Sequence, residues 1–140
     1  MTQNKTLLAV SKWIVTLFTA LMVVTAALVG NGMFNRQDDW LLTGHMHLGN
    51  LLFALAMLQG IFFFVLYIRK SIGMGVMLVS ALVAIFTFAQ IGLGYSTRNN
   101  MADIAGWHIA LGVGLTGTAA VLMTMLWMPA NRDNGGNTAG

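Results

Sequence analysis

The sequence predicts an all-α integral membrane protein, a four-helix bundle made of two tandem parallel helical-hairpin repeats. Three observations predict it: an apolar composition, four long apolar stretches and a motif that occurs twice. Of the 140 residues, 57% are hydrophobic and 8% are charged, and the mean hydropathy is +0.76. Since roughly a quarter of the residues in a typical soluble domain are charged, the solvent of this chain must be mostly lipid.

The four apolar stretches are each longer than the roughly 20 residues that a helix needs to cross a hydrocarbon core about 30 Å thick. The 7 basic and 4 acidic residues all fall between or outside these stretches. Because lipid offers no hydrogen-bond partners to backbone N–H and C=O groups, such segments must be helical. The predicted spans are residues 13–34, 45–68, 72–95 and 104–128.

The positions of the charged residues predict how the chain crosses the membrane. Most of the Lys and Arg residues fall in the N-terminal segment, the middle turn or the C-terminal tail, namely Lys5, Lys12, Arg69, Lys70 and Arg132. The other two connections contain only Arg36 and Arg98. By the positive-inside rule, both termini and the middle turn are therefore cytoplasmic. The Trp and Tyr residues agree, because they form one aromatic belt at each end of the spans.

The predicted segments are a cytoplasmic N-terminus, a first hairpin, a second hairpin and a disordered cytoplasmic tail, in residues 1–12, 13–68, 69–128 and 129–140. Pro129 ends the last span, and the tail has too little apolar content to pack. A cleaved signal peptide is an alternative interpretation of the first span, since Lys5 and Lys12 precede an apolar run, but the length of the run favours a membrane span. We therefore expect a multi-pass protein in the lipid bilayer of a bacterial or archaeal cell (inner) membrane.

Composition also excludes several function classes. The sequence pI is about 9.8, but the basic residues are spread over the segment ends and form no patch, so no nucleic-acid partner is expected. The chain contains no cysteine, which excludes disulfides, iron–sulfur clusters and thiolate ligands. Any redox or metal chemistry must therefore rest on His, Met and carboxylate side chains.

The repeated motif is G-x-G, then a single arginine, then H-x-x-L-G. It occupies residues 30–49 in the first hairpin and 92–112 in the second. Odd-numbered spans run outward and even-numbered spans run inward, so the two copies share one orientation and are related by a pseudo-twofold axis along the membrane normal. This relation places His45 and His108 at the same depth, just below the outer surface.

A histidine within a membrane helix is a candidate functional residue, because an imidazole in lipid is costly unless it is paired. With a step of about 100° per residue, Gly49, Ala56 and Gln59 share a helix face with His45. Gly112 stands in the same relation to His108. Small residues beneath each histidine leave a groove, and two imidazoles that face each other across a four-helix bundle match what a haem needs.

We therefore predict a haem b site. His45 and His108 are the predicted iron ligands, and Gly49 and Gly112 are the predicted floor of the site. Arg36 and Arg98 lie nine and ten residues before the two histidines, on the same side of the membrane. Their guanidinium groups are suited to pair with haem propionates, although both arginines have an equally simple interpretation as solvated loop charges.

The duplicated hairpin, with a histidine opening its second helix in an H-x-x-x-G setting, resembles one four-helix half of haem A synthase and the small four-helix proteins similar to it. The similarity covers roughly residues 14 to 128, and the motif is moderately specific. The resemblance implies that His45 and His108 are axial haem ligands near the outer face. This chain departs from the family in three ways. It has one such half, whereas haem A synthase has two. Met46 and Ile109 replace the arginine that commonly follows the family histidine, and the chain contains no glutamate. The resemblance therefore supports haem binding better than haem modification.

Several other interpretations remain open at this stage. His47 lies about 200° around the helix from His45, so it is an interfacial residue, or else the true ligand in place of His45. Histidines at helix starts also sit among lipid headgroups without any ligand. His-Met-His and the methionines, which include Met33, Met46, Met101 and Met123, suit Cu(I), although flexible packing explains them as well. Gln59 and Gln90 are interpreted as interhelical hydrogen-bonding residues.

The first functional hypothesis is a b-type haem protein that transfers single electrons near the outer face, as a subunit of a larger membrane complex or of a homo-oligomer. Two axial histidines leave no open coordination position on the iron, which favours electron transfer over oxygenation. The alternatives are an oxidoreductase related to haem A synthase that modifies haem or uses quinol, a metal transporter, and a structural or pigment-binding subunit.

Overall fold

The computed structural model describes residues 2–34, 39–98 and 102–128, and these residues form four helices without a strand. The helices are α1 (Thr2–Phe34), α2 (Asp39–Ile68), α3 (Met74–Arg98) and α4 (Ala102–Trp127). Each contains a segment of 24 to 29 residues that is long and apolar enough to cross a membrane. The prediction of an all-helical chain with four candidate membrane spans is confirmed.

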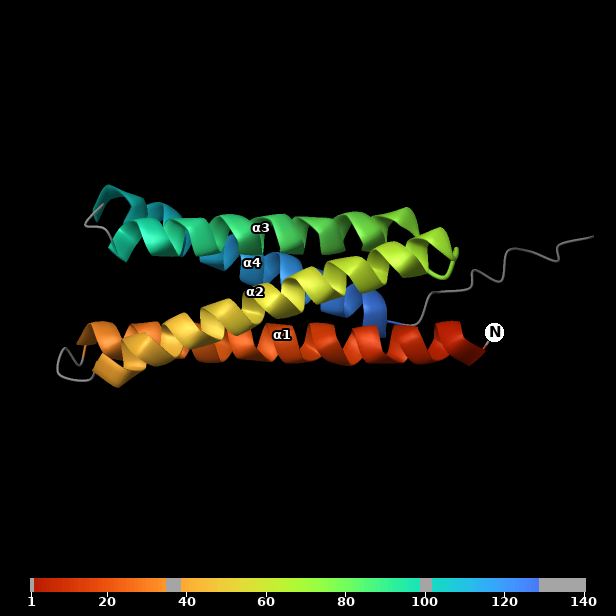
Figure 1. Ribbon diagram of the computed structural model, residues 1–140, viewed down its shortest axis with the longest axis horizontal. Coiled ribbons are helices and arrows are strands. Elements are labelled where there is room, and N and C mark those ends of the chain that lie inside the picture. The colour runs from red at the N-terminus through yellow and green to blue at the C-terminus, as the bar shows by residue number, and fades with distance from the viewer. Residues whose placement is uncertain (1, 35–38, 99–101, 129–140) are drawn as a thin grey trace, which may run out of the picture.

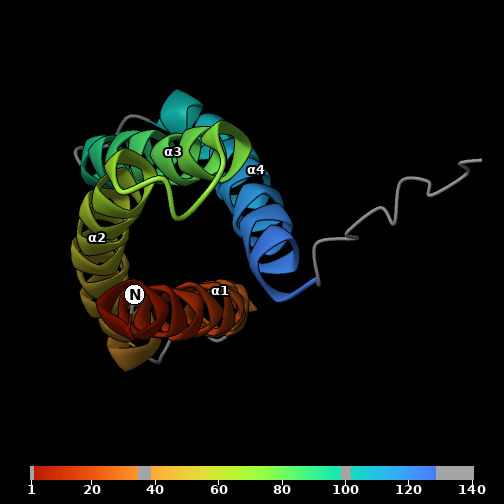
Figure 2. The ribbon, with the colours of Figure 1, turned by 90° about the vertical axis from the view of Figure 1, so that its right-hand side faces the viewer.

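The four helices form a ring in which each helix packs against two neighbours (Figures 1 and 2). Helix α1 packs against α2 and α4, and helix α3 also packs against α2 and α4. Consequently α2 and α4 lie diagonally opposite each other across the bundle. Side chains that point inward from these two helices can meet on the bundle axis.

The core consists of one stripe of buried residues on each helix, with alternating spacings of three and four residues. This heptad pattern is typical of left-handed helix packing, in which side chains of one helix fit between those of the next. The outward faces are apolar too, as lipid-facing helices are. The stripes comprise Ser11, Val15, Phe18, Met22 and Thr25 of α1, Leu52, Ala56, Gln59, Phe63 and Leu66 of α2, Ser80, Val83 and Thr87 of α3, and Leu115, Ala119, Leu122 and Leu126 of α4.

The two ends of the bundle differ. Helix α2 runs beside α1 at the end that holds the α1–α2 connection and beside α3 at the other end (Figure 1). At the end predicted to be cytoplasmic, α1 meets α4: the ring centroids of Trp13 and Trp127 are 5.6 Å apart, and Trp127 Nε1 donates a hydrogen bond of 3.1 Å to Thr16 Oγ1. The Lys12 ammonium lies 5.3 Å from the Trp127 ring. These contacts join α1 to α4 at that end.

The predicted helix boundaries need correction at the helix starts. Helix α1 begins at Thr2 instead of residue 13, because no glycine or proline interrupts the chain before Gly30. Helix α2 begins at Asp39 and α4 at Ala102, so His45 and His108 both lie in second turns, whereas the motif predicted that they open their helices. The extra turn of α2 buries Leu41, which is 7% exposed. The predicted disordered tail, 129–140, lies outside the described residues.

Candidate functional site

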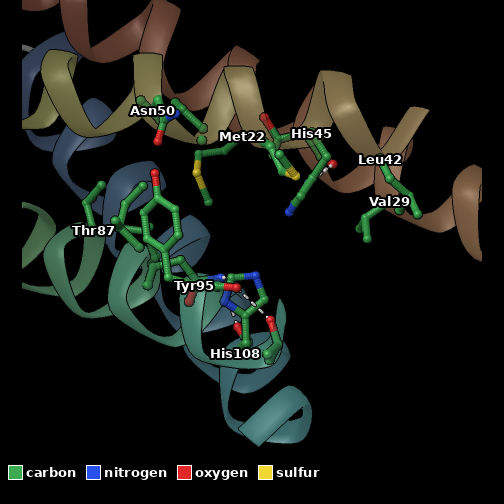
Figure 3. A pocket seen from close by; sticks show the side chains of 17 residues that line it. Met22, Val29, Leu42, His45, Asn50, Thr87, Tyr95 and His108 are labelled. Atoms are coloured by element: carbon green, nitrogen blue, oxygen red, sulfur yellow. Dashed lines mark hydrogen bonds between the residues drawn. The ribbon is translucent and has the colours of Figure 1, made fainter. Parts of the chain in front are cut away.

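A cavity of about 470 Å³ lies between the two hairpins, in the half of the bundle that contains both histidines (Figure 3). We call it the slot. Its volume falls within the range of about 300–1,000 Å³ that is usual for ligand pockets. One wall comes from α1 and α2 and the other from α3 and α4; the lining includes Met22, Thr25, Val29, His45, Met46, Gly49 and Asn50 on the first wall and Thr87, Gln90, Gly94, Tyr95, Thr97, His108 and Leu115 on the second.

The slot opens where α2 and α3 diverge. Asn50 of α2 and Tyr95 of α3 are both exposed residues of the lining, and Figure 3 shows their side chains directed toward each other. Further along the same pair of helices the rings of Phe53 and Phe88 meet, with centroids 6.3 Å apart. The opening is therefore bounded by aromatic packing on its inner side.

His45 and His108 face each other across the slot. Their ring centroids are 6.2 Å apart and their ring planes make an angle of 79°. An imidazole nitrogen binds a metal ion at about 2 Å, so two rings that ligate one ion from opposite sides have centroids on the order of 6 Å apart. The separation of the two rings thus matches bis-imidazole ligation of a single metal ion.

The His45 ring is oriented by a backbone carbonyl. His45 Nδ1 lies 3.1 Å from Thr25 O. Because a carbonyl oxygen only accepts hydrogen bonds, Nδ1 must carry the proton and donate it. In the neutral imidazole, Nε2 of His45 then has the free lone pair, and this is the form that ligates a metal.

The His108 ring is held by a side chain instead. Gln90 Nε2 donates a hydrogen bond of 2.9 Å to the backbone oxygen of His108 and lies 3.3 Å from His108 Nε2. The bond to the carbonyl fixes which end of the Gln90 amide is the NH₂ group. Nε2 of His108 must therefore accept the second bond, and its proton must be on Nδ1. That Nδ1 is buried and has no hydrogen-bond partner within the described part of the chain.

The glycines near the histidines are not equivalent either. A Cβ atom on Gly49 would meet no described atom within 4 Å, so the slot is open at this position. A Cβ atom on Gly112 would lie 3.1 Å from Gln90 Nε2, so the space below His108 is filled by that amide. A Cβ atom on Gly94 would lie 3.2 Å from His108 Cε1, and the missing side chain lets the His108 ring lie against α3.

The structure does not bring the remaining predicted site residues into the described slot. His47 is exposed and is not among the described residues that line the slot. Arg36 lies outside the described residues, and Arg98 ends α3 with a side chain whose placement is not described. No contact of either arginine with the slot is thus established. Met101 also lies outside the described residues, and the side chain of Met33 is not described.

Besides the histidines and glycines, sequence reasoning singled out Met46 and Gln90 of the slot lining, and Gln90 does bond to the neighbouring helix as predicted. It missed the threonines, Asn50 and Tyr95. Thr25 and Thr87 hold the same place in the two copies of the motif, since Gly30 and Gly92 are 62 residues apart and 25 + 62 = 87. Each of these threonines is buried and donates a 2.7 Å hydrogen bond to the carbonyl four residues earlier. Alignment of the two copies beyond the motif could therefore have identified them. Asn50 has no repeated counterpart, because residue 113 is Val.

Comparison of the chain with protein-family models, with curated proteins and with solved structures finds no match. The site must therefore be interpreted from its own residues. Among the residues that the structure describes, no group of three or more His, Cys, Asp or Glu side chains converges on one point. Two opposed imidazoles leave the other coordination positions of a metal to a ligand from outside the described residues, and a porphyrin would fill those positions. The histidine pair and the open groove at Gly49 fit a haem.

Proposed function

We propose that this protein binds a b-type haem in the slot, with His45 and His108 as axial ligands, and that it transfers single electrons near the outer face of a cell membrane. The observation that carries the proposal is the pair of opposed imidazole rings with centroids 6.2 Å apart inside a cavity of about 470 Å³. A bound haem would supply an iron that alternates between two oxidation states.

The chain's own residues would support that role in three ways. Thr25 O orients His45 through Nδ1, which fixes the tautomer and raises the basicity of the ligating nitrogen. Met22, Leu52 and Leu115 line the deep end of the slot, where apolar side chains exclude water and so influence the reduction potential. Asn50 and Tyr95 supply polar groups at the opening, where a porphyrin edge would lie.

The wider arrangement belongs to the same proposal. The two hairpins are tandem copies with one orientation, both termini are cytoplasmic, and the slot opens near the outer surface. The exposed rings of Trp40 and Trp107 suit an outer interface of the bilayer. A bundle this small needs an electron donor and an acceptor, so we expect it to work within a larger membrane complex or a homo-oligomer.

Absorption spectra test the proposal. The protein is expressed in membranes, purified in detergent and measured in its oxidised and dithionite-reduced forms beside His45→Ala and His108→Ala. We expect a low-spin b-type spectrum in the wild type, loss of bound haem in His45→Ala and loss of the low-spin form in His108→Ala. His47→Ala is the matched control, because His47 is exposed and lies outside the slot; its spectrum should equal that of the wild type. A wild type that stays colourless when haem is supplied contradicts the proposal.

A soft metal ion is a second candidate ligand. Met22 and Met46 line the slot together with His45 and His108, and thioether with imidazole is a donor set that suits Cu(I). Titration of the colourless protein with Cu(I), beside Met22→Leu and Met46→Leu, tests this function. Stoichiometric binding that both variants weaken would favour copper handling over haem binding.

A further inference from the structure

The two candidate ligands are bound to the protein in opposite ways. His45 donates a hydrogen bond from Nδ1 to the backbone oxygen of Thr25, which leaves its Nε2 available to a ligand. His108 uses Nε2, the nitrogen that would ligate a metal, as the acceptor for Gln90, and its Nδ1 is left without a partner among the described residues. From this difference we infer that His45 is the permanent ligand of the slot, whereas His108 is an exchangeable ligand that Gln90 holds back, so that a neutral diatomic molecule such as CO can bind in its place.

This inference rests on the proposed haem site and extends it. Two filled axial positions favour electron transfer over ligand binding, whereas an exchangeable histidine would open one position to small ligands. The ligand class is a neutral diatomic that binds ferrous haem. It would bind on the side of the slot lined by His108 and Gln90.

The first argument concerns the support behind each ring. A histidine that ligates a metal firmly almost always donates its other N–H to an acceptor, and loss of that acceptor typically weakens the site 10- to 100-fold. His45 has such an acceptor in Thr25 O, at 3.1 Å. Within the part of the chain that the structure describes, His108 Nδ1 has none, although it is buried. His108 is therefore the weaker ligand of the two.

The second argument concerns Gln90. Its amide is anchored to His108 O by the 2.9 Å bond, and that anchor does not depend on the position of the His108 ring. The contact to His108 Nε2 is longer, at 3.3 Å, beyond the usual range of about 2.7–3.2 Å for a nitrogen donor. The ring can therefore leave Gln90 to ligate the metal and return to it, while the amide stays in place.

The third argument is that the fold makes room for Gln90 on one side only. A Cβ atom at Gly112 would lie 3.1 Å from its amide nitrogen, so any larger residue there would require the amide to shift by a few tenths of an ångström. The residue of the first hairpin that corresponds to Gln90 is Leu28, since 90 − 62 = 28. Leu28 packs near Gly44 and has no hydrogen-bonding group. Only the second hairpin can hold its histidine in this way.

CO binding to the reduced protein tests the inference. We expect wild-type protein to bind CO, seen as a shift of the main absorption band. In Gln90→Leu, His108 no longer gives up a hydrogen bond when it ligates the iron, so it competes more strongly with CO. The CO affinity should therefore fall about five- to tenfold, which corresponds to one hydrogen bond. Gly112→Ala displaces the amide without removing it and should act in the same direction. Gln59→Leu, a buried glutamine outside the slot lining, is the matched control and should bind CO like the wild type.

A second measurement needs no haem. The chain has three histidines, so the imidazole nitrogen resonances of the haem-free protein can be assigned with single variants. We expect His108 in the Nδ1–H form, with an Nε2 signal that moves in Gln90→Leu while both His45 signals stay unchanged. A coloured wild type that does not bind CO, or equal CO affinity in wild type and Gln90→Leu, overturns the inference and leaves the haem proposal standing. A colourless wild type overturns the haem proposal itself, and an Nε2 signal that Gln90→Leu does not move overturns the contact on which the inference rests.

Discussion

His45 and His108 occupy the same place in the two copies of the motif, four residues before a glycine, yet their surroundings differ. The His45 ring donates a hydrogen bond to the main-chain carbonyl of Thr25, and the slot is open at Gly49. The second ring lies against Gly94 and accepts a hydrogen bond from Gln90, which fills the space at Gly112. Two occurrences of one sequence motif therefore contribute two rings that face each other, while neighbouring residues give the rings different hydrogen-bond partners.

The same contrast extends along the core. When His45 is aligned with His108, residues of α2 and α4 correspond at an offset of 63, since 108 − 45 = 63. On this alignment two buried positions have identical residues: Leu52 corresponds to Leu115, and Ala56 to Ala119. The next pair is Gln59 and Leu122. Gln59 of the first hairpin is fully buried, and neither of its amide atoms has a hydrogen-bond partner in the described residues. By contrast, Gln90 of the second hairpin is half-buried and bonded to His108.

The largest expected effect comes from filling the open groove. Gly49→Leu places a side chain in the slot beneath His45 without displacing a described atom near Cβ. Overpacking of this kind typically costs about 1–3 kcal/mol, so haem affinity should fall about 5- to 150-fold. The measurement is the haem-to-protein ratio after titration with haem.

Gly114→Leu is the control for this change. Gly114 is exposed on α4, and a Cβ atom there also meets no described atom within 4 Å. This variant should bind haem like the wild type. Equal haem affinity in both variants would show that the groove at Gly49 is not part of the binding site.

A smaller effect, of opposite sign, is expected for Gln59→Leu. The change gives the first hairpin the residue that the second hairpin has at Leu122. A buried polar group without a partner typically costs about 1–3 kcal/mol, so the variant should be more stable by an amount of this order. The midpoint of thermal unfolding in detergent measures it. A lower midpoint would show that Gln59 has a bonding partner in the folded protein.

The smallest effect is expected for Gly94→Ala. The new methyl group would lie 3.2 Å from His108 Cε1, and the ring would have to shift by a few tenths of an ångström. Alanine is favoured over glycine in a helix by about 1 kcal/mol, which offsets part of the strain. We expect a net destabilisation of about 1 kcal/mol or less.

Gly92→Ala provides the comparison for Gly94. Within the described residues no atom lies within 4 Å of a Cβ at position 92, so alanine there should leave unfolding unchanged or raise its midpoint. If both variants shift the midpoint equally, close packing of His108 against α3 does not contribute to stability.

Much of the fold follows from local properties of the sequence. Four apolar stretches of spanning length, separated by charged connections, predicted four helices, because a helix satisfies its own backbone hydrogen bonds where lipid would offer none. The period of the small and buried residues on α2 indicated which face turns inward, and Ala56 and Gln59 do lie in the core with the predicted orientation. The sequence also singled out His45 and His108, because a histidine is rare in a membrane helix and the motif that carries it is repeated.

Only the tertiary structure indicates which ring nitrogen of each histidine carries the proton. A ring's tautomer depends on which donor or acceptor a neighbouring helix brings within about 3 Å, and neither the carbonyl of Thr25 nor the amide of Gln90 is adjacent to its histidine in the chain. The groove at Gly112 was predicted from the absence of a side chain there, but only packing shows that a side chain from α3 fills it. Helix periodicity determines the face on which a residue lies, whereas the crossing of the helices determines what that residue meets.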